Sequence, residues 1–234
     1  MPAFEKTDAK DPSLLGVVFF ALLFALIGSV SGFTLLASIR PEPFSSVAEF
    51  ESEMEKNSEK RLLNAYYFKG PTSSLDNWVL KREILLNSNS TTVELTDAEI
   101  NAWIAKKFDF VQTPLSQKKK LKLVIIPGLP NFFINTAEGI HFSMKLEVVI
   151  QGQIIRSQIL GKGHFSGENP VGFQLSELRL NEASIPFPAK LSDRLLDLLV
   201  KSLNDNEEFI ALKEAWQKVN SVEVIENGIR LSLN

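Results

Sequence analysis

The hydrophobic pattern of the chain begins with one long apolar run near the N-terminus. No charged residue occurs from Leu14 to Ile39, and Leu, Phe, Val, Ile and Ala dominate the run. About 20 apolar residues suffice to cross the hydrocarbon core of a bilayer, and a chain in lipid must hydrogen-bond its backbone internally. The run therefore predicts a transmembrane helix over residues 14–39, which Arg40 and Pro41 end.

A cleaved signal peptide is the alternative interpretation of this run. Signal peptides carry a positive leading region and an apolar core of about 7–15 residues, whereas this run is longer and follows residues of both charge signs. Ser29-Val30-Ser31 would still fit a small-x-small cleavage site. For an uncleaved anchor, the positive-inside rule sets Lys6 and Lys10 against Arg40. It favours a cytoplasmic tail over residues 1–13, a single pass through the inner (cytoplasmic) membrane, and a bulk domain that is periplasmic or extracellular.

Residues 40–70 are charged but keep apolar residues at helical spacing. Val47, Phe50 and Met54 lie on one face of a helix, which predicts a helical stalk or linker. An amphipathic helix lying on the domain fits the same spacing. A cluster of Gly, Pro, Thr and Ser closes the segment, so residues 71–234 are expected to form the extracytoplasmic α+β domain.

Strict alternation of apolar and polar residues predicts long strands in the middle of the domain. The alternation over residues 140–150 gives a strand with one apolar face. Residues 131–136 should pair with it through a three-residue hairpin at residues 137–139. That register places Ile134 opposite Phe142, so the apolar sides of the two strands agree.

Two further features refine the sheet. A tight turn at Gln151-Gly152 places Met144 opposite Ile159. The apolar phase of a later strand changes near Ser176, which predicts a β-bulge at that residue.

Helices are predicted on both sides of these strands. Residues 96–99 (Thr-Asp-Ala-Glu) form a capping box, and Ile100, Trp103, Ile104 and Phe108 follow on one apolar face. The sequence thus predicts a helix of about three turns.

The C-terminal part is predicted to contain helices and a final hairpin. Residues 191–199 form a Leu-rich stripe, and a further helix should begin at Asp205. Asn227-Gly228 is the favoured pair for a type I′ turn. This turn would place Val224 opposite Leu231 and return the chain to the same sheet.

Composition removes most catalytic chemistry. The chain has 234 residues, of which 44% are hydrophobic and 23% charged, so it is too apolar for a disordered tail. Its net charge of -3 lacks the basic footprint of a nucleic-acid binder. The absence of Cys excludes disulfides, thiolate zinc sites and a Cys nucleophile. We therefore expect no enzymatic activity, no cofactor, no metal and no nucleic-acid partner.

The remaining polar signals have simple structural explanations. Residues 161–163 (Gly-Lys-Gly) lack the third glycine of a phosphate loop and fit a bend or bulge. His141 and His164 fall on the side of their strands that faces away from the apolar alternation, so both are expected at the surface. The basic run at residues 118–122 fits a solvated edge that discourages aggregation, or contact with anionic lipid headgroups.

The segment "VELTDAEINAWIAKKFDF" (residues 93–110) resembles the start of the folded domain in YceB-like and YpmS-like envelope proteins. Ile100-Asn101 matches their Leu/Ile-Asn step, and "IPFP" at residues 185–188 fits a later segment. The resemblance covers roughly residues 93–234. The chain lacks the lipobox Cys of the YceB type and has a transmembrane anchor, as the YpmS type does.

The resemblance implies a fold of the tubular lipid-binding (TULIP) superfamily. In that fold a curved antiparallel sheet wraps around or packs on amphipathic helices and leaves an apolar groove for acyl chains. Asn101 would bond strand or loop backbone and determine the fold more than it binds ligand. For each candidate lipid-binding residue, plain core packing is the alternative to lipid contact. These residues are Ile100, Trp103, Ile104, Phe142, Met144, Leu146 and Ile159.

Two functional hypotheses follow from these observations. The first is a membrane-anchored, non-catalytic domain that binds or transfers lipid-like molecules, with membrane lipid as its partner. The second is a structural or scaffold subunit that docks another membrane protein of the envelope, for which Val47, Phe50 and Met54 would supply an exposed apolar face. The sequence leaves the oligomeric state open.

Overall fold

The computed structural model describes residues 14–56, 66–87, 92–108, 113–114, 123–167, 171–186 and 206–234. The helices in these ranges are α1 (Leu14–Ser38), α2 (Val47–Lys56), α3 (Asn77–Asn87), α4 (Asp97–Lys107) and α6 (Glu207–Trp216). The strands are β1 (Glu42–Phe44), β2 (Tyr66–Phe68), β3 (Thr92–Thr96), β4 (Thr113–Pro114), β5 (Leu123–Asn135), β6 (Gly139–Ile150), β7 (Gln153–Ser166), β8 (Gly172–Leu180), β9 (Ala183–Ser184), β10 (Val219–Ile225) and β11 (Gly228–Leu233). The predicted α+β class is confirmed. The predicted Leu-rich helix and the basic run lie outside the described residues.

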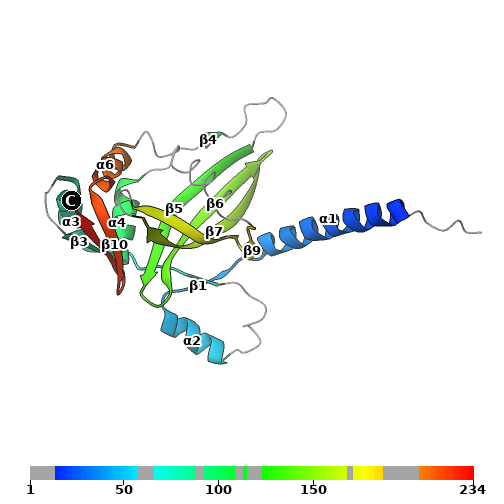
Figure 1. Cartoon of the computed structure of the whole chain (residues 1–234), viewed down its shortest axis with the longest axis horizontal. Coiled ribbons are helices and arrows are strands. Elements are labelled where there is room, and N and C mark those ends of the chain that lie inside the picture. Colours follow the sequence, from blue (N-terminus) through cyan, green and yellow to red (C-terminus); the bar gives the residue numbers. More distant parts are fainter. Residues whose placement is uncertain are drawn as a thin grey trace, which may run out of the picture.

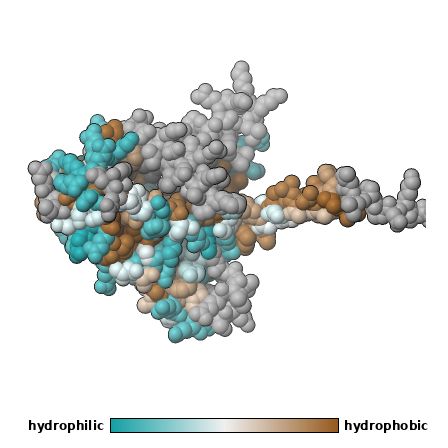
Figure 2. All heavy atoms as spheres, in the orientation of Figure 1, coloured by the Kyte–Doolittle hydropathy of each residue, from teal (hydrophilic) through white to brown (hydrophobic). Residues whose placement is uncertain are grey.

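Helix α1 extends away from the rest of the molecule. Its segment Val17–Ser38 has a mean hydropathy of 2.2 and no buried part, and it is long and apolar enough to cross a membrane. Figure 2 shows its described residues as a mainly apolar rod, whereas the visible face of the domain mixes polar and apolar residues. The helix predicted from the uncharged run is therefore present.

The described parts of the segment predicted as a helical stalk, residues 40–56 and 66–70, instead pack on the domain. Strands β1 and β2 pair in parallel, and the short helix α2 lies between them in sequence. Met54 of α2 is 6% exposed and packs with Phe44, Phe68 and Phe133. Phe133 belongs to β5 of the large sheet. The apolar face of α2, from which a stalk was predicted, therefore packs α2 onto that sheet. An amphipathic helix on the domain therefore describes this segment.

The large sheet has the order β4-β5-β6-β7-β8-β9, and all its pairs are antiparallel. The turn between β6 and β7 confirms the prediction: Gln151 and Gly152 both have positive φ, and Met144 lies opposite Ile159. Ser176 is the extra residue where the β7–β8 register shifts, and its Oγ donates to the carbonyl of Lys162 at 3.0 Å. The predicted bulge is therefore also confirmed.

The predicted register of the β5–β6 hairpin is wrong by two residues. Ile134 lies opposite Ile140, not Phe142, because Asn135 pairs with Gly139 across the turn. The Oδ1 of Asn135 accepts hydrogen bonds from the N–H of Ala137 at 2.8 Å and of the next residue at 3.3 Å. This side-chain cap moves the turn toward the N-terminus. Because the register shifts by two residues, each side chain stays on the face of the sheet that was predicted for it.

The C-terminal hairpin forms a separate sheet, β10-β11-β3, and does not rejoin the large one as predicted. Its register also differs from the prediction, since Val224 lies opposite Ile229 rather than Leu231. Gly228 starts β11 and is used for close approach to β3: a Cβ there would lie 2.4 Å from the carbonyl oxygen of Leu95. A glycine is therefore needed at position 228 because β3 approaches it closely, and not because the hairpin turn requires one.

Helices α3, α4 and α6 and the small sheet pack on one side of the large sheet, and the candidate site lies between them (Figure 1). Figure 1 shows α3, α4, α6 and the small sheet on one side of the long strands, with α1 extending away on the other. The large sheet is open, and within the described ranges it does not wrap around a helix as the TULIP resemblance implied. A space lined by the helices, the small sheet and the large sheet takes the place of that groove.

Replacing Gly228 with Ala tests the close pairing of β11 with β3. The added methyl group would collide with backbone atoms, so we expect the free energy of unfolding to fall by about 1–3 kcal/mol. Tryptophan-monitored thermal unfolding of the full chain in detergent micelles measures the effect. Gly172→Ala is the control, because a Cβ there meets nothing closer than 3.9 Å. Equal melting temperatures for the two variants would contradict this account.

Candidate functional site

Helix α4 forms one wall of the site, and its start is fixed by the predicted capping box. The N–H of Glu99 donates to Oγ1 of Thr96 at 3.2 Å, and the N–H of Thr96 donates to Oε2 of Glu99 at 2.9 Å. Lys81 of α3 donates to the same carboxylate oxygen at 2.7 Å. Burial would raise the pKa of Glu99, but these hydrogen bonds outweigh it and lower that pKa. The cap therefore also joins α3 to α4.

Asn101 attaches α4 to the large sheet, as the sequence predicted. It is 3% exposed, and its Nδ2 donates to the carbonyls of Pro71 and Phe132, both at 2.8 Å. Its Oδ1 accepts from the N–H of Phe132 at 2.7 Å. One side chain thus satisfies backbone groups of β5 and of the segment before α3. The apolar residues of α4 are consequently held facing the sheet.

An apolar cavity of about 380 Å³ lies between these elements. Every described residue that lines it is hydrophobic, and together these residues come from α3, α4, α6, the three-stranded sheet, the large sheet and the residue after α4. The lining residues are Leu85, Leu95, Ile100, Trp103, Ile104, Phe108, Pro130, Phe132, Ile134, Ile140, Phe142, Met144, Phe165, Phe173, Phe209, Leu212, Trp216, Ile229 and Leu231.

The structure brings most of the predicted site residues together. The residues of this set that line the apolar cavity are Ile100, Trp103, Ile104, Phe142 and Met144. Leu146 and Ile159 do not line it; they pack with Leu178 in a neighbouring cluster under the sheet. Both lie on the same face of the sheet as Met144 but do not line the cavity. The alternation of apolar residues, which predicts only the face of the sheet, therefore could not predict which residues line the cavity.

Several aromatic residues of the cavity were not included in the prediction. Phe165 and Phe173 come from β7 and β8, and Phe209 and Trp216 come from α6. The helical spacing of Phe209 and Trp216 was visible in the sequence, but it gave no indication that α6 would face α4. Their place depends on how separate elements assemble, and one sequence does not show this.

Two glycines of β7 make room for rings in the cavity wall. A Cβ at Gly161 would lie 2.1 Å from Cε1 of Phe142, and one at Gly163 would lie 2.6 Å from Cζ of Phe173. Each ring therefore lies directly across the backbone of the neighbouring strand. The Gly-Lys-Gly segment adjoins the β-bulge, and its glycines serve packing.

The polar atoms of the cavity wall are satisfied on its outer side. The indole Nε1 of Trp103 donates to Oε1 of Glu208 at 2.6 Å, and Trp216 Nε1 donates to the carbonyl of Val171 at 2.8 Å. Arg82 of α3 forms an ion pair with Glu208 through both of its carboxylate oxygens. Burial would raise the pKa of Glu208, but the bonds from Arg82 and Trp103 outweigh it and lower that pKa. The inner wall that the described residues form is therefore wholly apolar.

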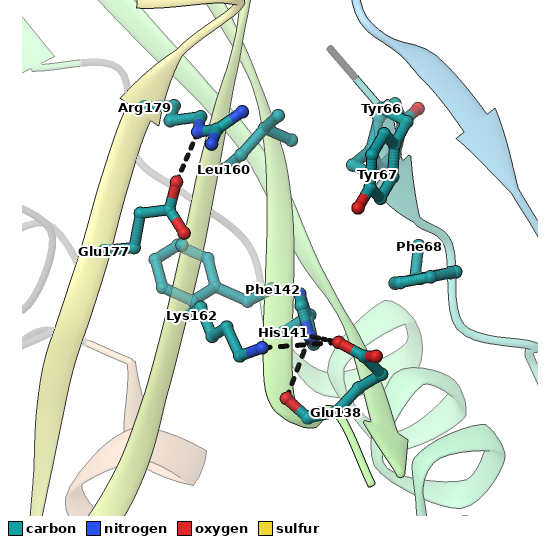
Figure 3. Close-up of a pocket in the computed structure, with 11 residues that line it drawn as sticks. Tyr66, Tyr67, Phe68, Glu138, His141, Phe142, Leu160, Lys162, Glu177 and Arg179 are labelled. Atoms are coloured by element: carbon teal, nitrogen blue, oxygen red, sulfur yellow. Dashed lines mark hydrogen bonds and ion pairs between the residues drawn. The ribbon is translucent and has the colours of Figure 1, made fainter. Parts of the chain in front are cut away.

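A second, polar pocket of about 150 Å³ lies against β2 (Figure 3). Glu138 binds Lys162 at 3.3 Å, and Glu177 binds Arg179. Figure 3 also shows His141 beside Glu138, whose carbonyl lies 3.1 Å from Nε2 of the histidine. Because both carboxylates are paired with cations, this arrangement favours a structural ion-pair network over acid–base chemistry.

His141 is more enclosed than the sequence predicted. Its side chain is 19% exposed and makes edge contacts with Phe68 and Phe133. Burial lowers the pKa of His141, and the charge of Lys162 lowers it further, against the opposing effect of Glu138. The alternation of apolar and polar residues in β6 gave no sign that β2 would cover His141. His164 is exposed, as predicted.

Within the described ranges, no group of three or more His, Asp or Glu residues is placed to hold a metal ion. Comparison with known proteins gives no family model that matches the chain and no curated relative. The function must therefore be argued from the cavities themselves.

Replacing Asn101 with Ala tests the attachment of α4. The change leaves buried backbone groups of β5 without partners, so we expect a loss of about 2–4 kcal/mol in the free energy of unfolding. Thermal unfolding of the full chain in micelles measures it. Asn206→Gly removes a half-buried N-cap and an exposed hydrogen bond to the carbonyl of Lys107 but keeps a tolerated cap residue, so it should cost no more than about 1 kcal/mol. A loss at Asn101 no larger than at Asn206 would argue against this role.

The Arg82–Glu208 pair predicts a pH-dependent stability. Since the folded-state pKa of Glu208 is lowered, the pair stabilises the fold fully above the ordinary glutamate pKa of about 4.3. That contribution is lost as the pH falls through the lower folded-state value. We expect Glu208→Gln to cost about 1–3 kcal/mol at neutral pH and progressively less in acid, as measured by melts at several pH values. Glu214→Gln, on an exposed part of the same helix, should show no such trend; a constant difference for Glu208→Gln would contradict the assignment.

Proposed function

We propose that this chain is a membrane-anchored, non-catalytic protein that binds the apolar part of a lipid-like molecule in the cavity between α4, α6 and the large sheet. The observation that carries the proposal is the wholly hydrophobic lining that the described residues give a cavity of about 380 Å³. Ligand pockets commonly measure about 300–1,000 Å³. Because the described residues place no polar group on its wall, the cavity suits an alkyl chain better than a polar substrate.

The size of the cavity supports a ligand over an imperfectly packed core. Protein interiors contain few voids larger than a water molecule, and a dry cavity of about 150 Å³ already accepts benzene. An enclosed empty cavity of this volume would cost roughly 9 kcal/mol at about 24 cal/mol per Å³. Among the described residues the space is half-open, so without a ligand its apolar wall would be exposed to water, which is unfavourable in proportion to the apolar area. An apolar ligand would remove that area from water.

Helix α1 supports the membrane part of the proposal. Its length and hydropathy suit a membrane span, and Lys6 and Lys10 precede it while Arg40 follows it. We place the N-terminus in the cytoplasm and the domain outside it, according to the positive-inside rule. The domain would then receive lipid-like molecules beside the bilayer that anchors it. The resemblance to YpmS-like and TULIP proteins agrees with this function, and the apolar cavity supports the function independently of that resemblance.

The residues offered as a docking face under the scaffold hypothesis are packed inside the described structure. Val47, Phe50 and Met54 were expected to present an apolar face to a partner. Instead, Met54 is buried, and Val47 and Phe50 pack against the same internal cluster. The apolar face of α2 is therefore covered by this chain itself.

Photolabelling locates the proposed ligand. The full chain is reconstituted in liposomes that contain palmitate with a photoactivatable diazirine, and labelled peptides are identified by mass spectrometry. We expect labels on peptides of α4, β6 and α6 in addition to α1. Ile104→Trp fills part of the cavity and should reduce the domain labels about tenfold, since both area and volume for the chain are lost.

Ile210→Trp is the matched control for this experiment. Ile210 is 45% exposed and lies on α6 outside the cavity lining, so the same substitution should leave labelling unchanged. The label on α1 reports membrane insertion in every variant. Labelling confined to α1, or equal domain labelling in both Trp variants, would refute ligand binding in the apolar cavity.

A further inference from the structure

A polar pocket of about 350 Å³ lies where α1 joins the large sheet. We name it the junction pocket. Arg40, which follows α1, lines it together with Lys145 of β6 and Arg156 of β7. Tyr67 of β2 adds a hydroxyl group to the same pocket. Figure 1 shows α1 meeting the domain beside β9, away from the helices that line the apolar cavity.

A buried asparagine fixes the position of this pocket relative to α1. Asn181 is 1% exposed, and its Nδ2 donates to the carbonyl of Ala37 in the last turn of α1. Its Oδ1 accepts from the N–H of Gln158 at 2.7 Å, and its own N–H donates to the carbonyl of Gln158 at 2.7 Å. The end of α1 is thus bonded through one residue to β7. The pocket wall on β7 consequently keeps a fixed relation to the end of the helix.

The junction pocket carries an excess of positive charge. Its lining contains three cationic side chains, Arg40, Lys145 and Arg156, and one carboxylate, Glu147. Glu147 lies opposite Arg156 in the β6–β7 register and accepts from its Nε at 2.9 Å. No ion pair joins Arg40 or Lys145 to any residue in the described part of the chain. Among the described residues, two of the three positive charges in this concave site therefore have no compensating carboxylate.

We propose that the junction pocket binds the phosphate group of an anionic phospholipid headgroup. The inference rests on the membrane insertion of α1 in the proposed function, but not on the ligand of the apolar cavity. When α1 spans the bilayer, Arg40 lies at the depth of the lipid phosphates, because it follows the last apolar residues. Guanidinium groups bind phosphate oxygens in pairs, and a lysine supplies a further charge. Tyrosine is also typical of this interfacial depth.

Native mass spectrometry of the full chain tests the proposal. The chain is released from detergent micelles that contain equal amounts of phosphatidylglycerol and phosphatidylcholine. We expect one phosphatidylglycerol to be retained in preference to phosphatidylcholine by about tenfold, as roughly one to two uncompensated charges near the surface would give. The triple variant Arg40→Gln, Lys145→Gln and Arg156→Gln should retain the two lipids equally.

Two further variants separate the site from general charge and from misfolding. The triple variant Lys106→Gln, Lys213→Gln and Lys218→Gln removes as many charges from exposed positions on and beside α4 and α6, and it should keep the preference. The charge-conserving variant Arg40→Lys with Arg156→Lys should keep most of it. If the control triple variant loses the preference as fully as the pocket variant does, the pocket is not the site and the proposal fails.

Added inorganic phosphate distinguishes a headgroup from a soluble anion. A preference that persists in excess phosphate supports the lipid headgroup, whereas loss of the preference together with calorimetric phosphate binding overturns it. Ile104→Trp should leave this preference intact. If palmitate fails to label the domain of the unmodified chain while the lipid preference is intact, only the proposed function is refuted. Recovery of the full chain in the aqueous phase without detergent would refute this inference and the anchor together.

Discussion

The hydrogen bonds of Asn101 are the constraint on which the rest of the site depends. A buried amide must find partners, and here those partners are the backbone of β5 and of the segment before α3. The geometry of these bonds, rather than the packing of side chains, sets how closely α4 approaches the sheet. Apolar residues beside Asn101 then face a space that they do not fill. A polar contact thus maintains a hydrophobic opening.

Charges have a supporting role around this opening. The Arg82–Glu208 pair and the bond from Trp103 join α3, α4 and α6 on the outer side of the cavity wall. The Lys81–Glu99 contact joins α3 to the start of α4. The helices therefore hold one another through polar groups at their outer edges, while their apolar residues form the core and the cavity wall.

Local signals in the sequence predicted the features that local chemistry determines. The Gln151-Gly152 turn needs two residues with positive φ, the Thr96–Glu99 box needs only its own four residues, and the Ser176 bulge follows from a change of apolar phase. The C-terminal turn was misplaced because Gly228 serves contact with β3, a tertiary feature. In the same way, alternation predicted the sheet face of Phe142 and Met144 correctly. It could not show that Leu146 lies beyond the cavity or that α6 brings Trp216 to it.

The glycines of β7 have a consequence for the shape of the cavity. The rings of Phe142 and Phe173 line the cavity and lie against the backbone at Gly161 and Gly163. A methyl group at Gly161 would lie 2.1 Å from the ring of Phe142 and displace it, whereas one at Gly163 would collide first with the carbonyl oxygen of Gln174 at 2.3 Å. A related protein could therefore alter the shape of the cavity by one carbon atom at Gly161 without changing any residue that lines the cavity.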